Sequence, residues 1–288
     1  MFKRKVKKIA LFFNGDRGIS VYKKLINKYE ITLILTNSKK IKEKFKKNII
    51  FSKNINEERT HKLLKKKDID LFVSAGFSNI FKKKLLVIPK YGIINLHAGP
   101  VPKYRGGSPL NWQLINNEKN IILSVLKMNK GIDTGPIIET KKFPIKKNYD
   151  IKKLHSIANK AFPSMVLKSI KKIELNKKFI FQPENKKNYW RQRNEQDGKI
   201  FFNKFSGYLI GRYIRALTIP YPGAWASLNG KKIIFYKAKL LKKKITGNYG
   251  SLKTIKGKIC LKCRYINLQI LKYKLIGKKI KKFDHQLI

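Results

Sequence analysis

The chain has 288 residues, of which 42% are hydrophobic and 11% aromatic, so folding can bury a sizeable core. Its formal net charge is +52, from 68 Lys and Arg against 16 Asp and Glu. The apolar content excludes a disordered basic tail, and the charge by itself would indicate a nucleic-acid or anionic-membrane partner. Only nine of the basic residues are Arg, however, and Lys is spread over almost every segment. We interpret this as a codon bias toward A and T at solvated positions, because a phosphate-binding face is more often rich in Arg and confined to one region.

The sequence carries no targeting or membrane signal. Residues 1–8 are basic, but the apolar run at residues 9–13 is too short for a signal peptide. No stretch approaches the roughly 20 apolar residues of a membrane-spanning helix. These features predict a soluble, cytoplasmic protein with no membrane partner. Cys260 and Cys263 form one close pair without a second pair or a nearby His, so we expect neither a disulfide framework nor a metal site.

The first half of the chain alternates short apolar runs with amphipathic segments. Strands are expected at residues 8–13, 31–35, 49–51, 70–74 and 92–96. A turn at residues 14–18 leads into one helix, and a second helix is expected at residues 57–66. Apolar strands separated by helices favour parallel βαβ units with both sheet faces covered. The predicted fold class is therefore α/β, with a Rossmann-like, doubly wound N-terminal domain.

The second half begins with a long helix, expected at residues 153–175, and a polar connector follows it. After a helix at residues 206–217, short β segments are expected at residues 224–228, 232–238, 251–255, 258–263 and 266–271. Several short strands with close turn signals predict a smaller, mainly β C-terminal domain, barrel-like and either open or closed. The expected domains are residues 1–180, a connector at residues 181–198, and residues 199–288.

Two segments hold residues suited to chemistry. Asn95 and His97 stand two apart at the end of an expected strand, so both side chains project from one face. The next 12 residues hold three Pro and three Gly, which predicts a rigid loop over the strand end. Asp133 lies between two glycines at the end of another strand. Ligand sites of open α/β sheets lie at such ends, so an amide, an imidazole and a carboxylate converge if these strands are neighbours.

This combination suits acyl transfer to an amine. N–H donors from Asn95 and His97 can stabilise an oxyanion, and Asp133 can hold the His tautomer and take part in proton movement. Each residue also has a plainer interpretation, since Asn-x-His is often a structural pair and Asp133 could form a turn. The rigid loop beside them favours the functional interpretation. His61, by contrast, lies in a Lys-rich segment and is expected to be solvated.

These residues resemble the folate-dependent formyltransferases, which include methionyl-tRNA formyltransferase, glycinamide ribonucleotide formyltransferase and the amino-sugar N-formyltransferases. The resemblance is carried by Asn95-x-His97, by the Pro102-x-Tyr-Arg-Gly106 loop and by Asp133-Thr-Gly135, with Asp133 36 residues after His97. It extends over most of the chain. The start of the C-terminal domain in the tRNA and sugar branches is similar to Arg191-x-Arg193-x-x-x-Asp197-Gly198, Ile214-Arg-Ala216 and Pro220-Tyr-Pro-Gly-Ala224.

The resemblance implies an enzyme that takes a formyl group from 10-formyltetrahydrofolate, with Asn95, His97 and Asp133 as catalytic residues and no metal. The residues that it places near the pterin of this donor are Ser74, Gly76, Phe77, Ser78 and Gly131. Those that we expect near the acceptor are Gly15, Tyr104, Arg105 and Trp112. Gly99 stands where many members carry Ser, a departure that we do not expect to touch the catalytic residues.

The acceptor is expected to be a primary amine. The tRNA enzymes would need a long basic loop after the second strand, whereas residues 38–47 form a short Lys-rich segment here. We therefore favour a small-molecule acceptor, a nucleotide-linked 4-amino sugar, over methionyl-tRNA. Two other possibilities stay open at this point: a non-catalytic basic RNA-binding protein, and hydrolysis of the formyl-folate with water as acceptor. The sequence does not indicate an oligomeric state.

Overall fold

The computed structural model describes residues 5–45, 48–228, 230–276 and 284–287. The chain forms two compact units, and it passes between them several times. The first comprises the residues up to 109 together with 120–144 and 156–190. The second comprises residues 110–119, 145–155 and 191 onward. The contiguous domain boundaries expected at residues 180 and 198 stay a prediction.

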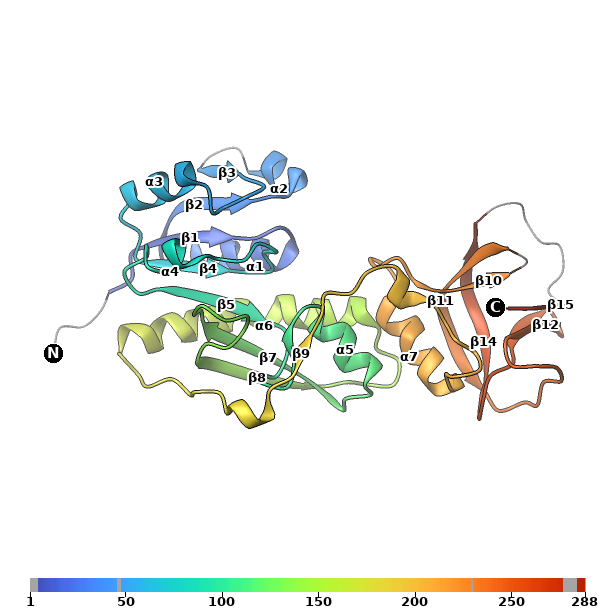
Figure 1. Cartoon of the computed structure of the whole chain (residues 1–288). Coiled ribbons are helices and arrows are strands. Elements are labelled where there is room, and N and C mark those ends of the chain that lie inside the picture. The colour runs from blue at the N-terminus through green and yellow to red at the C-terminus, as the bar shows by residue number, and fades with distance from the viewer. Residues whose placement is uncertain (1–4, 46–47, 229, 277–283, 288) are drawn as a thin grey trace. The chain divides into compact units, whose positions relative to one another are not determined.

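The first unit contains a seven-stranded sheet in the order β3-β2-β1-β4-β5-β7-β8 (Figure 1). The strands are β1 (Lys8–Phe12), β2 (Glu30–Thr36), β3 (Ile49–Phe51), β4 (Leu71–Ser74), β5 (Ile93–His97), β7 (Asn120–Lys127) and β8 (Ile137–Pro144). The first five in this order are parallel, and β7 and β8 are antiparallel to their neighbours. This order confirms the expected Rossmann-like, doubly wound arrangement.

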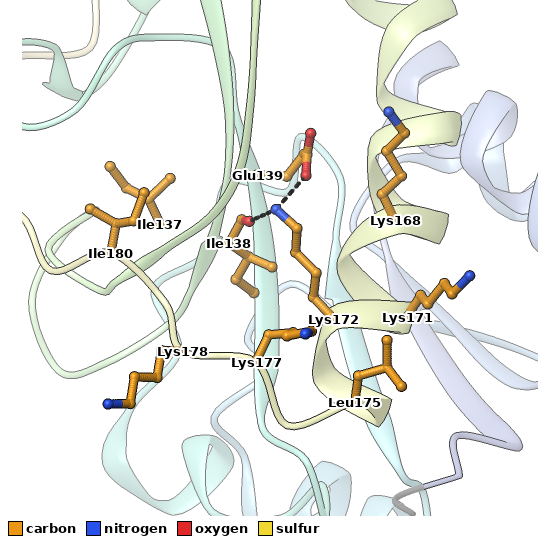
Figure 2. Close-up of a pocket in the computed structure, with 10 residues that line it drawn as sticks. All are labelled: Ile137, Ile138, Glu139, Lys168, Lys171, Lys172, Leu175, Lys177, Lys178 and Ile180. Atoms are coloured by element: carbon orange, nitrogen blue, oxygen red, sulfur yellow. Dashed lines mark hydrogen bonds and ion pairs between the residues drawn. The ribbon is translucent and has the colours of Figure 1, made fainter.

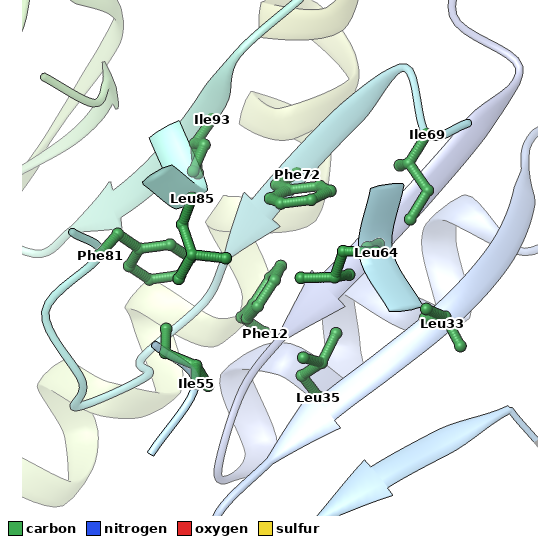
Figure 3. Packing of buried hydrophobic residues seen from close by; sticks show 11 residues of the cluster. Phe12, Leu33, Leu35, Ile55, Leu64, Ile69, Phe72, Phe81, Leu85 and Ile93 are labelled. Atoms are coloured by element: carbon green, nitrogen blue, oxygen red, sulfur yellow. The ribbon is translucent and has the colours of Figure 1, made fainter. Parts of the chain in front are cut away.

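Helices cover both faces of this sheet. They are α1 (Asp16–Leu25), α2 (Lys39–Lys44), α3 (Glu58–Lys66), α4 (Lys83–Leu86) and α6 (Ile151–Glu174). On one face, α3 and α4 bring Leu64 and Leu85 onto the aromatic rings of Phe12, Phe72 and Phe81 (Figure 3). The rings of Phe12 and Phe81 lie 4.9 Å apart between centroids. Burial of each such side chain stabilises the fold by about 1.5–3 kcal/mol.

The expectation that His61 is solvated is wrong. His61 is only 5% exposed, because α3 turns Thr60, His61 and Leu64 toward the sheet and its lysines toward water. The three buried positions fall on one side of the helix, as residues three and four apart do. The Lys-rich composition of the segment therefore describes only the outer face of α3.

The second unit is an antiparallel sheet with helices α5 (Pro109–Ile115) and α7 (Gly207–Leu217). Its strands are β10 (Ala224–Leu228), β11 (Lys231–Leu241), β12 (Ser251–Ile255), β13 (Lys258–Leu261), β14 (Asn267–Leu275) and β15 (Asp284–Gln286), in the order β10-β11-β14-β13-β12-β15. A bridge between Leu228 and Leu287 joins the two ends of this order. The expected barrel-like C-terminal architecture is thus confirmed.

Two short strands complete the first unit. β6 (Arg105–Gly106) lies in the loop after β5 and pairs in parallel with β9 (Tyr189–Trp190). The segment before β9 contains the 3₁₀ helix η1 (Glu184–Lys186), and η2 (Gln196–Gly198) follows in the second unit. Within the described ranges, no helix combines the length and the apolar character needed to cross a bilayer.

Candidate active site

The structure brings Asn95, His97 and Asp133 together. β5 ends at His97, and the antiparallel strand β7 beside it leads into the loop that carries Asp133. Asn95 Nδ2 donates to Asp133 Oδ1 at 3.0 Å, and His97 Nδ1 lies 3.3 Å from Asp133 Oδ2. The sequence analysis expected this convergence of an amide, an imidazole and a carboxylate on the condition that the two strands are neighbours, and β5 and β7 are.

The carboxylate of Asp133 is shielded and held on both oxygens. Its side chain is 11% exposed, and the backbone N–H of Gly106 donates to Oδ2 at 2.9 Å. The backbone at Asp133 has φ of +51°, in the left-handed region that a short polar side chain tolerates better than most. The loop thus adopts an uncommon backbone conformation that turns the carboxylate toward β5.

The imidazole of His97 is enclosed. It is 5% exposed, and its Nε2 lies 2.6 Å from the carbonyl oxygen of Tyr104. Both ring nitrogens therefore face acceptors, the carboxylate on one side and the carbonyl on the other. A neutral imidazole can donate to one of them, whereas an imidazolium donates to both. In either form the ring is fixed in orientation by its two neighbours.

Gly99 lies against this imidazole, so the expectation that position 99 does not touch the catalytic residues is wrong. A Cβ atom at Gly99 would stand 2.8 Å from His97 Nε2 and 2.9 Å from Pro109 Cβ. The carbonyl oxygen of Gly99 also accepts a hydrogen bond from the buried Ser124 hydroxyl. Such distances leave no room for a side chain, so glycine allows the loop to close over His97.

The loop after β5 packs firmly on the segment that precedes the second unit. Tyr104 is 1% exposed, and its ring stacks on Trp190 with centroids 5.4 Å apart. Arg105 is fully buried. Tyr104 and Arg105 were both expected near the acceptor, and contact between their side chains and an acceptor would require this loop to move.

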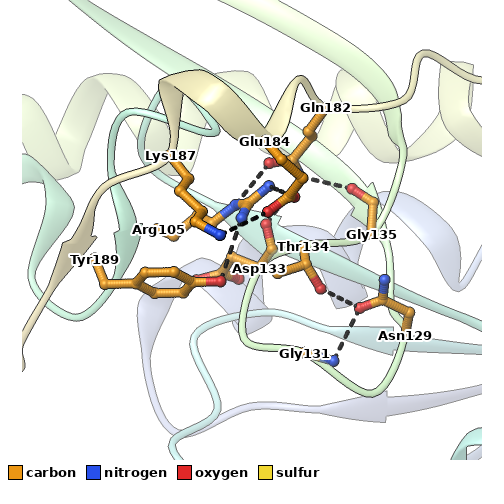
Figure 4. A network of polar contacts seen from close by, with 10 residues as sticks. All are labelled: Arg105, Asn129, Gly131, Asp133, Thr134, Gly135, Gln182, Glu184, Lys187 and Tyr189. Carbon is orange, nitrogen blue, oxygen red and sulfur yellow. Dashed lines mark hydrogen bonds and ion pairs between the residues drawn. The ribbon is translucent and has the colours of Figure 1, made fainter.

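Arg105 instead forms a polar network with the segment at residues 182–189 (Figure 4). Its guanidinium donates to Gln182 Oε1 at 2.9 Å, to Glu184 Oε1 at 2.9 Å and to the Tyr189 hydroxyl at 3.2 Å. Burial alone would lower the pKa of Arg105, but its hydrogen bonds to Glu184 and Tyr189 raise the pKa above the ordinary value. The hydrogen bond from Arg105 lowers the pKa of Glu184 in turn.

Gln182 is a residue of this site that the sequence analysis missed. Its Nε2 donates to the carbonyl oxygens of Asp133 and Gly135, at 2.8 and 2.6 Å. Gln182 lies in a polar stretch with no regular apolar period, and no motif marks it. Only the fold shows that this stretch returns to the loop that carries Asp133.

The residues expected near the donor follow β4. Ser74 ends that strand and pairs with Asn95 in the sheet, so the two positions are neighbours. Ser78 Oγ accepts hydrogen bonds from the amides of Asn14 and Asn37, which follow β1 and β2. Three strand ends thus meet at the C-terminal edge of the parallel strands, where ligands of such sheets bind.

The other residues expected near the donor or acceptor differ in their surroundings. Phe77 packs on the aromatic core, and Gly76 has φ of +74°. Gly15, before α1, borders open space. The Gly131 N–H donates to Asn129 Oδ1 within the loop that carries Asp133.

Trp112 lies in the second unit. Its indole N–H donates to the carbonyl of Arg191, and the guanidinium of Arg193 lies 4.7 Å from its ring centroid. Arg191 also forms an ion pair with Asp197. Arg191 and Arg193, the two arginines of the Arg-x-Arg motif, therefore take part in packing inside the second unit.

A separate hollow of about 530 Å³ lies between β8, the end of α6 and residues 177–180 (Figure 2). Lys168, Lys171, Lys177 and Lys178 line it, while Lys172 reaches across to Glu139 at 2.7 Å. None of the expected site residues lines this hollow. Among the residues that the structure describes, no three or more His, Cys, Asp or Glu side chains gather to hold a metal.

Comparison with known proteins defines the class. The model described as "Formyl transferase" matches residues 14–170, and "Formyl transferase, C-terminal domain" matches residues 193–285. The methionyl-tRNA formyltransferase of Orientia tsutsugamushi is 32% identical over 213 residues, which cover 74% of this chain and 68% of that protein. The chain therefore belongs to the formyltransferase family, as the sequence resemblance predicted, and is a formyl-transfer enzyme.

The chain covers very different shares of its other relatives. The bifunctional polymyxin resistance protein ArnA of Wigglesworthia glossinidia brevipalpis is 34% identical over 234 residues, 78% of this chain and 35% of that protein. Among solved structures, the sugar 3N-formyltransferase WlaRD matches with a TM-score of 0.68 at 20% identity, over 96% of this chain and all of that one. HypX of Aquifex aeolicus with tetrahydrofolic acid matches with a TM-score of 0.69 at 15% identity, over 94% of this chain and 44% of that one. At these identities the structural likeness shows the fold alone.

Proposed function

We propose that this chain transfers a formyl group from 10-formyltetrahydrofolate to a primary amine, with Asn95, His97 and Asp133 as its catalytic residues. The observation that carries the proposal is the contact of Asp133 with both of the other two side chains, at 3.0 and 3.3 Å, beside a closed loop. Two solved relatives were crystallised with a folate, HypX with tetrahydrofolic acid and WlaRD with 5-N-formyl-THF.

The residues fit the chemistry of such a transfer. The amine nitrogen bonds to the formyl carbon, the bond from that carbon to N10 of the folate breaks, one proton leaves the amine and one reaches N10. The second amide N–H of Asn95 would polarise the formyl oxygen as negative charge develops on it. His97 would add an N–H from Nε2 once that nitrogen leaves the Tyr104 carbonyl, which it faces at 2.6 Å here. Asp133 would orient both donors and accept the proton that the amine releases.

The donor would lie along the C-terminal edge of the parallel strands. Ser74, Gly76, Phe77 and Ser78 come directly after β4, beside Asn95, and Gly131 lies in the loop of Asp133. The amides of Asn14 and Asn37 add polar groups at the same edge. A ring rich in hydrogen-bonding groups, such as a pterin, suits such a surface.

Methionyl-tRNA is the acceptor that the relatives favour. Several relatives at 28% to 32% identity are named methionyl-tRNA formyltransferase, among them those of Orientia tsutsugamushi and Clostridium beijerinckii. A chain with a net charge of +52 would also attract a large polyanion. On this evidence we rank the charged tRNA first, and so revise the preference that the sequence analysis gave to the sugar.

A nucleotide-linked 4-amino sugar is the second candidate. The observation that favours it is the brevity of the segment after β2: α2 spans only Lys39–Lys44, and β3 begins at Ile49. A segment of this size is short for a loop that must grip a large nucleic acid. Among the fold relatives, WlaRD is a sugar 3N-formyltransferase, an N-formyltransferase from Helicobacter canadensis is solved with dTDP-3-aminofucose, and the relative from Francisella tularensis is a 4-N formyltransferase.

One experiment separates these functions. Purified protein is incubated with 10-formyltetrahydrofolate and, in parallel, with charged initiator tRNA, a panel of nucleotide-linked amino sugars, or buffer, and tetrahydrofolate release is measured. Release that requires an amine supports the proposal, and the acceptor with the largest kcat/KM identifies the branch. Equal release in buffer alone would indicate hydrolysis. RNA binding without release under any condition would indicate a non-catalytic RNA-binding protein and overturn the proposal.

A further inference from the structure

We infer that Gln182 and Arg105 are positioning residues that fix the carboxylate of Asp133, an inference that rests on the proposed function of Asp133. Asn95, His97 and Gly106 hold the carboxylate of Asp133, whereas the contacts inside the loop from Asn129 to Gly135 are short ones, such as the hydrogen bond from Thr134 Oγ1 to Asn129 Oδ1. Its backbone at Asp133 is in the left-handed region, which is costly for a residue with a Cβ atom. An external restraint is therefore expected, and Gln182 supplies one.

Gln182 clamps the loop on both sides of Thr134. Its Nε2 donates to the carbonyl oxygens of Asp133 and Gly135, so one amide group uses both of its hydrogens on the same turn. Gln182 is 9% exposed, so water competes little for these bonds. The position of the Asp133 backbone thus depends directly on the orientation of this amide.

Arg105 fixes that orientation. Its Nε donates to Gln182 Oε1 at 2.9 Å, which directs the NH₂ group of the amide at the two carbonyls rather than away from them. The residue after Arg105 is Gly106, whose N–H donates to Asp133 Oδ2. Arg105 therefore acts on Asp133 along two routes, through Gln182 to its backbone and through the neighbouring peptide to its side chain.

The outer half of the network offers matched controls. Glu184 and Tyr189 also accept hydrogen bonds from Arg105, at 2.9 and 3.2 Å (Figure 4). Glu184 is 62% exposed. Replacing Glu184 should disturb Arg105 only slightly, whereas replacing Gln182 changes the hydrogen bond to the backbone of Asp133.

The test compares Gln182→Glu with Glu184→Gln. The first change keeps size and shape but turns a carboxylate oxygen toward the two carbonyls, so the loop should shift. We expect kcat to fall by about 100-fold, since a displacement near 1 Å can have that effect, while KM for 10-formyltetrahydrofolate stays within about threefold. Glu184→Gln should keep kcat within about threefold. The kcat of Arg105→Lys, which keeps the charge but loses the planar guanidinium, should lie between those of the other two variants.

A second readout does not depend on activity. The downfield ring-proton NMR signal of His97, assigned by its loss in His97→Gln, should move in Gln182→Glu and stay in place in Glu184→Gln. If kcat and the His97 signal are unchanged in Gln182→Glu, or if both variants lose activity only in proportion to unfolded protein, the positioning role is refuted. If the wild-type protein transfers no formyl group but the signal moves as expected, the proposed function fails and the positioning contact stands.

Discussion

At the scale of single residues, the chemistry converges on Asp133, which contacts Asn95, His97 and the Gly106 N–H. Asp133→Asn would place an NH₂ group against one of these donors. We expect kcat to fall by about 100-fold or more in Asp133→Asn, Asn95→Ala and His97→Ala, because each loses an oriented donor or its support. Steady-state kinetics measure this loss, and circular dichroism checks the fold.

Asn148→Ala serves as the matched control, since Asn148 is an exposed asparagine outside the site. It should keep near-native turnover. Near-native rates in the three site variants would instead show that the reaction takes place elsewhere on the chain.

Gly99 gives a second prediction at this scale. In Gly99→Ala the new methyl group would meet His97 Nε2 at 2.8 Å and Tyr104 Cβ at 3.1 Å, so the ring or the loop must shift. Overpacking of this kind destabilises a protein by about 1–3 kcal/mol. We expect a lower melting temperature and a clear loss of kcat. Gly15→Ala, at a glycine that borders open space, is the control and should be far milder in thermal melts.

The sequence predicted these single residues unevenly. Asn95 and His97 could be found because a strand places alternate residues on one face. Asp133 follows β7, which runs antiparallel to β5, so its approach to them depends on the path of the loop after β7 rather than on parallel strand ends. Gln182 and the contact of Gly99 with His97 could not be found. Both depend on where a loop and a distant segment pack, which no local pattern encodes.

At the scale of elements, the extent of the strands was predicted well where their residues are buried and less well where their residues are exposed. β14 was expected to end at residue 271 but runs to Leu275, and β11 was expected to end at residue 238 but runs to Leu241. These outer residues are largely exposed, yet each set pairs with the partner strand: residues 239–241 of β11 with residues 267–269 of β14, and residues 272–275 of β14 with residues 233–237 of β11. Backbone hydrogen bonding can extend a strand beyond the residues whose apolar pattern predicts it.

Cys260 on β13 and Cys263, two residues after β13, are both buried in the unit of this sheet and support a further prediction. Burial raises the pKa of the Cys263 thiol to about 12 and also raises the pKa of Cys260. A raised pKa keeps a thiol protonated, so at pH 7 to 8 the reactive thiolate is scarce. We expect slow labelling of both cysteines by iodoacetamide in the native protein, with Cys263 the slower, and rapid labelling in denaturant. Mass spectrometry of labelled peptides measures this, and fast native labelling of Cys263 would contradict its burial in this unit.

At the scale of the whole molecule, the fold class followed from the alternation of strands and helices, whereas the interleaving of the two units did not. Residues 110–119 and 145–155 belong to the second unit, although the family model of the N-terminal part, which matches residues 14–170, includes them. Asn111 Nδ2, for example, donates to the carbonyl of Ala216 at 2.7 Å. Pairings over such sequence distances are set by packing, and no local pattern in the sequence encodes them.

The distribution of lysines at this scale leads to the test of the acceptor. α2 exposes Lys39, Lys40 and Lys44, and it follows β2 directly. Its start therefore lies at the C-terminal edge of the sheet, where Asn37 contacts Ser78. A helix between parallel strands runs back across the sheet, so the end of α3, with Lys65 and Lys66, lies toward the opposite edge.

Replacing Lys39, Lys40 and Lys44 by Ala should distinguish the acceptors. With charged tRNA, kcat/KM should fall by about tenfold at low salt and less at high salt, because these charges act through counterion release and long-range attraction. With a nucleotide-linked amino sugar, kcat/KM should stay within about threefold, since surface charges mainly steer large partners. Replacing Lys62, Lys65 and Lys66 of α3 by Ala removes the same charge and is the control. Equal losses on tRNA from both triple variants would show a general effect of net charge and contradict a tRNA contact at α2.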